Sequence, residues 1–282
     1  MRERRYDRAY VLPNSFKSAL VLFLPISRCA PAGAARCATD CSTTPGCWTK
    51  TPALMVERYV ALAYDNGVMR CAKDLPQPLL WPQLQVNEGE KSQACSAFNL
   101  SNDRPIIGFC PGAEFGPAKR WPHYHYAALA KKLIDDGYQI ALFGSAKDNE
   151  AGKEIIAALS SEQQQARCRN LAGETQLEQA VILIAACKAV VTNDSGLMHV
   201  AAALDRPLVA LYGPSSPDFT PPLSHKARVI RLITGYHKVR KGDAAEGYHQ
   251  SLIDITPERV LQELNELLAE KTSTRKRNGC GY

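Results

Sequence analysis

Short apolar runs alternate with longer amphipathic stretches along the chain after about residue 100. An apolar run of four to six residues bounded by glycine, proline or polar residues is typical of a buried strand, and a longer run with a 3.6-residue period is typical of a helix. The pattern predicts strands at 105–110, 138–143, 189–192 and 207–212, and a short extended piece at 169–172. It predicts helices at 123–136, about 148–159, 176–187 and 197–204. This alternation predicts a parallel sheet covered by helices on both faces.

The pattern before residue 100 is less regular. Residues 6–12 predict a strand, residues 54–64 a helix, and residues 83–102 a polar linker with one short helix. We therefore divide the chain into a partial N-terminal domain, 1–99, and a complete C-terminal domain, 100–270. Within the latter, a helix from Thr256 to Leu268 is expected, because a threonine N-cap and a proline at the first helical position precede an apolar stripe. Residues 271–282 form a tail that we expect to be disordered.

Residues 27–52 follow no structural period. The segment holds Cys29, Cys37, Cys41 and Cys47, and Trp48 is its one large apolar residue. A secreted disulfide module would need an oxidising compartment, which the rest of the chain does not indicate. We favour a shifted reading frame that is restored near residue 54; a genuine divergent loop is the alternative, ahead of a metal site.

The residues around 189–204 predict an anion site. An apolar strand, 189–191, is followed by a short polar turn and then by helix formers. Asp194 or Ser195 is placed to be the N-cap of that helix. The unpaired N–H groups of a first helical turn and the helix dipole both favour bound negative charge. A capped helix with a packed histidine, His199, explains the same residues without a ligand.

A second loop has the composition of a phosphate site. The strand at 105–110 leads into residues 111–122, which hold two glycines and three prolines, with Lys119 and Arg120 near the end. A glycine-bearing loop with a terminal cation between strand and helix suits a phosphate group. A surface loop with a solvated Lys-Arg pair is the plain alternative.

Right-handed crossovers place the C-terminal ends of parallel strands at one edge of a sheet. Four loops would then meet there: 111–119, 144–148, 193–196 and 213–217. We expect them to line one crevice.

Composition limits the classes of function. The chain is 45% hydrophobic and 22% charged, as in soluble globular proteins, and its net charge of +6 suits acidic partners. No nucleic-acid-binding signature occurs, and neither a signal peptide nor an apolar run long enough to span a membrane is evident. Ten cysteines without ligand spacing indicate free thiols in a reducing cytoplasm. His123 and His125 are spaced awkwardly for one helical face, so we expect no zinc pair.

Two motifs together carry a family resemblance. Pro-Gly-Ala-x-x-Gly-x-x-Lys-x-Trp-Pro at 111–122 and Asn-Asp-Ser-Gly-Leu-Met-His at 193–199 resemble the heptosyltransferases of lipopolysaccharide inner-core assembly, glycosyltransferase family 9. Among these, the chain looks most like the enzymes that add the second heptose. The resemblance is continuous over about 100–268 and returns in 5–20 and 54–82. It implies an α/β fold of the GT-B type, with residues 100–270 as the Rossmann-like, donor-binding domain.

The resemblance implies inverting transfer of heptose from ADP-heptose to heptose I of the lipopolysaccharide core, without a metal or other cofactor. Lys119 is the expected catalytic cation, which stabilises the leaving diphosphate, with Arg120 as second choice. Asp194 is expected to cap and orient rather than to touch phosphate, and either Asp148 or Glu150 to bind ribose hydroxyls. The other expected ADP-heptose contacts are Gly112, Ser195, Gly196, Leu197 and His199.

The expected partners are ADP-heptose and the lipopolysaccharide core acceptor, with peripheral contact at the cytoplasmic face of the inner membrane and no nucleic acid. The family places its catalytic base in a first strand–helix turn that we do not find in this sequence. We therefore keep a second hypothesis, a non-catalytic nucleotide-sugar-binding remnant, and expect the chain to be nearly inactive in transfer.

Overall fold

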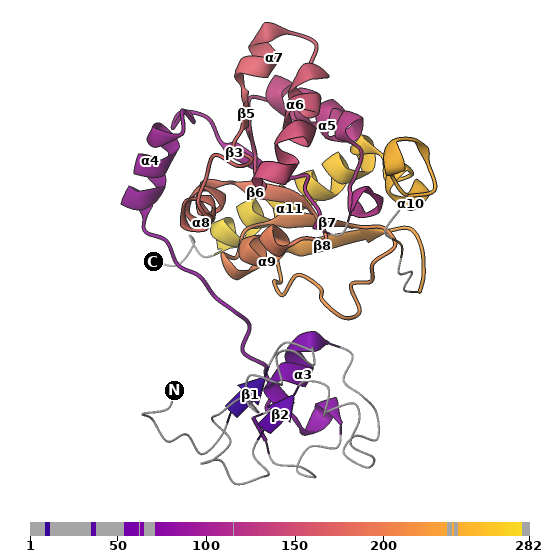
Figure 1. The fold of residues 1–282 in the computed structure, drawn as a ribbon. Coiled ribbons are helices and arrows are strands. Elements are labelled where there is room, and N and C mark those ends of the chain that lie inside the picture. The colour runs from indigo at the N-terminus through magenta and orange to yellow at the C-terminus, as the bar shows by residue number, and fades with distance from the viewer. Residues whose placement is uncertain are drawn as a thin grey trace, which may run out of the picture. The chain divides into compact units, whose positions relative to one another are not determined.

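The computed structural model describes residues 9–11, 35–37, 54–61, 63–64, 71–114, 116–235, 239 and 242–277. The chain divides into two compact units (Figure 1). The first comprises Met1–Leu80 with Asp218–Pro221, and the second comprises Trp81–Pro217 with Pro222–Tyr282. This division lies earlier than the boundary at 99/100 that the sequence predicts.

The first unit holds a parallel strand pair and a helix. Strand β1 (Ala9–Val11) pairs with β2 (Ala35–Cys37), so part of the segment without a period forms a short strand. Helix α3 (Met55–Ala61) lies inside the predicted helix at 54–64 and is followed by the 3-10 turn η1 (Ala72–Asp74). The remainder of 27–52 and most of the predicted strand at 6–12 lie outside the described residues.

The second unit is built on one six-stranded sheet, all of whose neighbouring strands run parallel, in the order β5-β4-β3-β6-β7-β8. The strands are β3 (Ile106–Cys110), β4 (Gln139–Leu142), β5 (Cys168–Asn170), β6 (Ala189–Asn193), β7 (Leu208–Tyr212) and β8 (Ala227–Arg231). Four of the six, β3, β4, β6 and β7, were predicted as strands from apolar runs, and β5 overlaps the short extended piece predicted at 169–172. The parallel α/β fold class is therefore confirmed.

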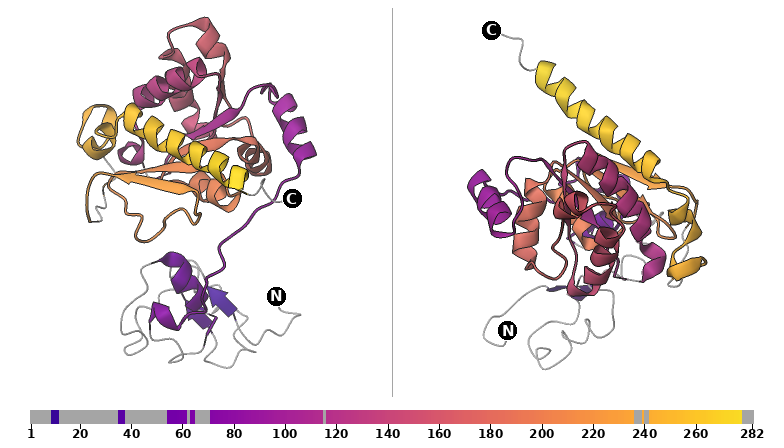
Figure 2. Two further views of the ribbon diagram at one scale, coloured as in Figure 1. Left: turned by 180° about the vertical axis from the view of Figure 1, so that it is seen from behind. Right: turned by 90° about the horizontal axis from the view of Figure 1, so that it is seen from above.

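Helices cover both faces of this sheet. The helices are α4 (Glu88–Ala97), α5 (His123–Asp135), α6 (Asn149–Ala157), α7 (Glu162–Ala166), α8 (Leu177–Ala186), α9 (Gly196–Ala203), α10 (Gln250–Ile253) and α11 (Pro257–Arg277). Helices α8 and α9 lie in front of the sheet in Figure 1, and α11 crosses the opposite face in the left view of Figure 2. Short 3-10 turns η2 (Pro117–Lys119), η3 (Ala146–Asp148) and η4 (Ala245–Gly247) complete the unit.

Alternate residues of each central strand enter two separate cores, because successive side chains of a strand point to opposite faces. In β3, Ile107 and Phe109 pack in the core beneath α5, α6 and α11, whereas Ile106 and Cys110 pack in the core beneath α4, α8 and α9. Strands buried on both faces read as continuous apolar runs, which is why the sequence pattern located them.

Three elements differ from the sequence prediction. Strand β8 lies at the edge of the sheet and exposes Val229, so its sequence lacks a continuous apolar run. Helix α4 is the short helix predicted within 83–102, but it packs against α8 and belongs to the second unit rather than to a linker. Helix α11 continues to Arg277, past residue 271, where we expected a disordered tail.

The packing predicts how two leucine-to-alanine variants differ. Leu264 of α11 is fully buried, whereas Leu177 of α8 is 69% exposed. We expect Leu264→Ala to lower the free energy of unfolding by about 2–5 kcal/mol, since it leaves a cavity in the core. Leu177→Ala should change it by about 0.5 kcal/mol or less. Urea unfolding followed by circular dichroism measures both, and equal losses would contradict the assigned position of α11.

Candidate functional site

The C-terminal ends of β3, β4 and β6 open into three loops at one edge of the sheet. They are residues 111–122, 144–148 and 193–195, and each leads into a helix or 3-10 turn. Because the three strands are neighbours in the order β4-β3-β6, their loops are neighbours as well. Side-chain contacts join these three loops. The expectation that four loops line one crevice is not met, because the cavity here is lined by residues of 111–122 and 144–148 and not by those of 193–196 or 213–217.

Lys119 and Asp194 form an ion pair between two of the loops. Lys119 Nζ lies 2.9 Å from Asp194 Oδ2, and the two side chains are only 20% and 14% exposed. A half-buried pair is screened less by water than a surface pair, so it holds both groups in place. Of the two candidates for the N-cap of α9, Ser195 occupies the position. Asp194 does not cap the helix, because its carboxylate is directed to Lys119.

Arg120 and Asp148 link the first loop to the second. Arg120 Nη2 lies 3.3 Å from Asp148 Oδ1. The other carboxylate oxygen of Asp148 accepts hydrogen bonds from the backbone N–H and the hydroxyl of Ser145, at 2.9 and 2.7 Å. Gly112 lies directly beside this carboxylate, since an added Cβ would be 2.5 Å from Asp148 Cγ. The glycine therefore lets the two loops approach closely.

Gly196, the first residue of α9, is exposed to solvent. Apart from its chain neighbours and the backbone of its own helix, no described atom lies within 4 Å of the position that a Cβ on Gly196 would take. The Ser195 side chain makes no capping hydrogen bond to the helix; its hydroxyl lies 3.4 Å from that of Thr192. The first N–H groups of the helix are thus available to an anion.

His199 lies one turn into α9 and exposes part of its side chain. Burial of the ring lowers the pKa of His199, and the nearby Asp194 carboxylate acts in the opposite direction. The imidazole is therefore mainly neutral near pH 7 and can donate one hydrogen bond. It is not simply a packed core histidine.

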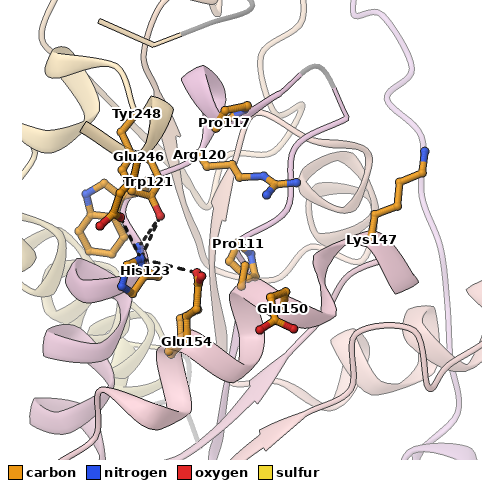
Figure 3. Close-up of a pocket in the computed structure, with 12 residues that line it drawn as sticks. Pro111, Pro117, Arg120, Trp121, His123, Lys147, Glu150, Glu154, Glu246 and Tyr248 are labelled. Carbon is orange, nitrogen blue, oxygen red and sulfur yellow. Dashed lines mark hydrogen bonds and ion pairs between the residues drawn. The ribbon is translucent and has the colours of Figure 1, made fainter. Parts of the chain in front are cut away.

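A cavity of about 520 Å³ adjoins the loop that carries Lys119 (Figure 3). Pro111, Pro117 and Arg120 of that loop line one side, and α6 contributes Glu150 and Glu154. The remaining lining residues are Trp121, His123, Lys147, Ala151, Ile155, Glu246 and Tyr248. Carboxylates and a phenol hydroxyl are groups that bind hydroxyl-rich ligands.

His123 is the centre of the polar contacts in this cavity, as the dashed lines in Figure 3 show. Its Nδ1 lies 3.0 Å from the Tyr248 hydroxyl and 3.7 Å from a carboxylate oxygen of both Glu154 and Glu246. His125, by contrast, bonds through Nε2 to the Ile253 carbonyl at 2.9 Å. The two histidines therefore bond to different partners.

Most of the predicted site residues come together, in two groups. Lys119, Asp194, Ser195, Gly196 and Leu197 lie where β3 and β6 end, with His199 one turn further along α9. Arg120, Gly112 and Asp148 form the contact between the first two loops. Glu150 stands apart from both, exposed on the cavity side, with its carboxylate 3.3 Å from Lys153 Nζ.

Asn193 and Tyr248 were not predicted as site residues. Asn193 is fully buried and its amide bonds to both ends of loop 111–121. A buried asparagine at the end of an apolar strand was the available signal. Tyr248 follows His123 by 125 residues and had no signal in the sequence.

Among the described residues, no group of three or more histidine, cysteine, aspartate or glutamate side chains is arranged to hold a metal ion. Within the same part of the chain, no helix is long and apolar enough to cross a membrane. The described cysteines that are free thiols are Cys71, Cys95, Cys110, Cys168 and Cys187. Burial raises the pKa of Cys110, at the end of β3, to about 12, so this thiol is no nucleophile at neutral pH.

Several known proteins are similar to this chain in sequence and in fold. The sequence model of glycosyltransferase family 9 (heptosyltransferase) matches residues 1–249. Lipopolysaccharide heptosyltransferase 2 of Salmonella typhimurium is 76% identical over 277 residues, which are 96% of this chain and 78% of that protein. The protein of the same name from Escherichia coli is 76% identical over 281 residues, with the same coverage. The solved structure of E. coli ADP-heptose LPS heptosyltransferase II matches with a TM-score of 0.80 at 67% identity, covering 96% of this chain and 79% of that one.

The close contact at Gly112 predicts a difference between two glycine-to-alanine variants. Gly112→Ala would place a methyl group against the Asp148 carboxylate, so we expect a loss of about 1–3 kcal/mol in the free energy of unfolding. Gly196→Ala meets open space at the start of a helix, so we expect a change of about 1 kcal/mol or less. Thermal and urea unfolding distinguish the two, and a Gly112→Ala protein as stable as the parent would contradict the packing described.

The surroundings of His199 predict its titration. NMR of the ring protons should give a midpoint below the value of about 6.5 for an unperturbed imidazole, because burial disfavours the charged form. The folded state then takes up this proton at lower pH than the unfolded chain does, so this group lowers stability as the pH falls below about 6.5. The signal is assigned by its absence in His199→Gln. A midpoint above 6.5 would show that Asp194 dominates instead.

Proposed function

This chain belongs to glycosyltransferase family 9, the heptosyltransferase family, and on that premise we propose that it transfers heptose from ADP-heptose to heptose I of the lipopolysaccharide inner core. It is an enzyme of that family with its α/β fold of the GT-B type. The observation that carries the proposal is the convergence of Lys119 and the open N-terminus of α9 at one edge of the sheet.

This convergence suits the diphosphate of the donor. A nucleotide diphosphate is an anion that bears more negative charge on its leaving oxygen as the glycosidic bond breaks. The amides of Ser195, Gly196 and Leu197 and the Ser195 hydroxyl would hold the phosphate oxygens. Fixed donors of this kind stabilise developing charge, and one such donor is typically worth about 3 kcal/mol in the barrier.

Lys119 would be the catalytic cation. An ammonium group has three N–H donors, so Lys119 can keep its bond to Asp194 and still donate to a phosphate oxygen. Asp194 therefore orients Lys119 rather than binding phosphate, which like-charge repulsion disfavours. Arg120, held by Asp148, would supply a second positive charge beside the diphosphate. His199 would donate to a phosphate or sugar oxygen.

The hydroxyl groups of the donor need acceptors, and the second loop supplies carboxylates. Asp148, which lies against Gly112, or Glu150, which lines the cavity, would accept from the ribose. We assign the transfer as inverting. Stabilisation of the leaving diphosphate is assigned to Lys119 and Arg120, with no metal or other cofactor.

The acceptor side of the proposal rests on the relatives. They are named lipopolysaccharide heptosyltransferases, and we propose the lipopolysaccharide core as acceptor for this chain. Because that acceptor is anchored in lipid, we also propose peripheral contact with the cytoplasmic face of the inner membrane. The net charge of +6 supports attraction to anionic lipid rather than a nucleic-acid partner.

Replacing Lys119 tests the site directly. We expect the parent chain to bind ADP in calorimetry without added metal. Lys119→Met should raise the Kd for ADP on the order of tenfold to a hundredfold, since a charge-assisted hydrogen bond contributes about 1.5–3 kcal/mol. In transfer of radiolabelled heptose to a heptose-primed core lipid, the same variant should lose on the order of a hundredfold or more in kcat/KM.

The matched control is Lys131→Met, which removes the same charge from an exposed position on α5. It should bind ADP and transfer heptose as the parent does. ADP binding without any transfer by the parent chain would favour the second hypothesis, a non-catalytic nucleotide-sugar-binding protein. Unchanged ADP binding in Lys119→Met would instead refute the diphosphate site as drawn.

A further inference from the structure

Asn193 is a buried amide with all of its hydrogen-bonding capacity in use. It is the last residue of β6, and its side chain is inaccessible to solvent. Its Nδ2 donates to the Pro111 carbonyl at 2.7 Å and lies 3.5 Å from the Gly112 carbonyl. Its Oδ1 accepts from the Trp121 backbone N–H at 3.1 Å and from the Tyr126 hydroxyl at 3.2 Å. Two donors and two acceptor positions are what a primary amide offers.

These bonds join both ends of one loop to a single side chain. Pro111 begins the loop that carries Lys119, and Trp121 ends it. Asn193 also immediately precedes Asp194, the partner of Lys119. One residue thus ties the loop with the cation to the turn with the carboxylate and the N-terminus of α9.

The chemistry of this position requires an amide. A carboxylate has no donor for the two carbonyl groups, and an aliphatic side chain would leave Pro111 O and Trp121 N–H buried without this partner. Burial raises the pKa of Tyr126 well above its usual range, so its hydroxyl stays a donor to Asn193. The Trp121 indole is fixed in turn, because its N–H donates to the Ile255 carbonyl at 2.8 Å.

We propose that Asn193 is a positioning residue for donor binding: it sets the spacing between Lys119 and the N-terminus of α9, and thereby pre-forms the diphosphate site. The inference rests on the proposed function, since it assumes that ADP binds at this edge. Lysine has a long flexible side chain, and its affinity for an anion depends on how well the backbone that carries it is fixed. Asn193 acts through that backbone and touches no ligand itself.

A second buried amide provides the control. Gln139 is 6% exposed and lies at the opposite edge of the sheet, at the start of β4. Its Nε2 donates to the carbonyls of Ser101 and Arg104, and its Oε1 accepts from the Ser101 N–H at 3.0 Å. Gln139 thus fastens a loop to the sheet as Asn193 does, but far along the strands from Lys119.

The test compares Asn193→Ala with Gln139→Ala in the full chain. Both variants should melt at lower temperature than the parent. By calorimetry with ADP, below both melting transitions, we expect Asn193→Ala to raise the Kd at least tenfold and Gln139→Ala to leave it within twofold. Equal ADP affinity in Asn193→Ala and the parent would overturn the inference, and so would an equal loss in both variants. Tyr126→Phe is a milder change and should raise the Kd for ADP by about two- to fivefold. It replaces Asn193→Ala in the test if that variant does not fold.

A double-mutant cycle separates positioning of Lys119 from a general structural role. If Asn193 acts through Lys119, the effect of Asn193→Ala should largely disappear in a Lys119→Met background. Additive losses would overturn that route. A parent chain that binds no ADP would refute the proposed function together with this inference, whereas a parent that binds ADP equally well without Asn193 would refute this inference alone.

Discussion

The ammonium group of Lys119 and the carboxylate of Asp194 lie 2.9 Å apart although 75 residues separate them in the sequence. The pair can form because β3 and β6 are adjacent and parallel, so that the loops after them leave the sheet at the same edge. A charge that is only 20% exposed needs a partner, and Asp194 supplies one. We propose that Lys119 forms an anion site together with the backbone N–H groups at the N-terminus of α9.

The sequence predicted the central part of this arrangement because its signals are local. Buried parallel strands read as apolar runs, and the glycine-rich loop with Lys119 and the turn at Asp194–Gly196 follow two of them directly. The same reasoning could not predict β8, an edge strand that exposes Val229, or the packing of the short helix α4 against α8, which the polar residues of α4 hide. Patterns of burial are clear only where both faces of an element are covered.

Roles within the site were harder to predict than membership of it. Asp194 was expected to cap a helix, but a cation brought in from another loop is a stronger partner than one backbone N–H. Asp148 was expected to accept from ribose hydroxyls, and in the structure its carboxylate is bound to Ser145 and Arg120. Asn193 and Tyr248 act through contacts with residues far away in the sequence, and nothing in their own neighbourhood reveals this. The family resemblance correctly indicated the enzyme class, which residue spacing alone does not establish.

The central claim is that a diphosphate binds between Lys119 and the first turn of α9. Amide NMR of the isotopically labelled chain during titration with ADP tests it most directly. We predict that the largest shifts occur at the N–H groups of Gly196 and Leu197 and around Lys119, and that the N–H of Ser101 at the opposite end of the strands is unaffected. Shifts confined to residues away from the ends of β3 and β6, or no shift at Gly196 at saturating ADP, would contradict it.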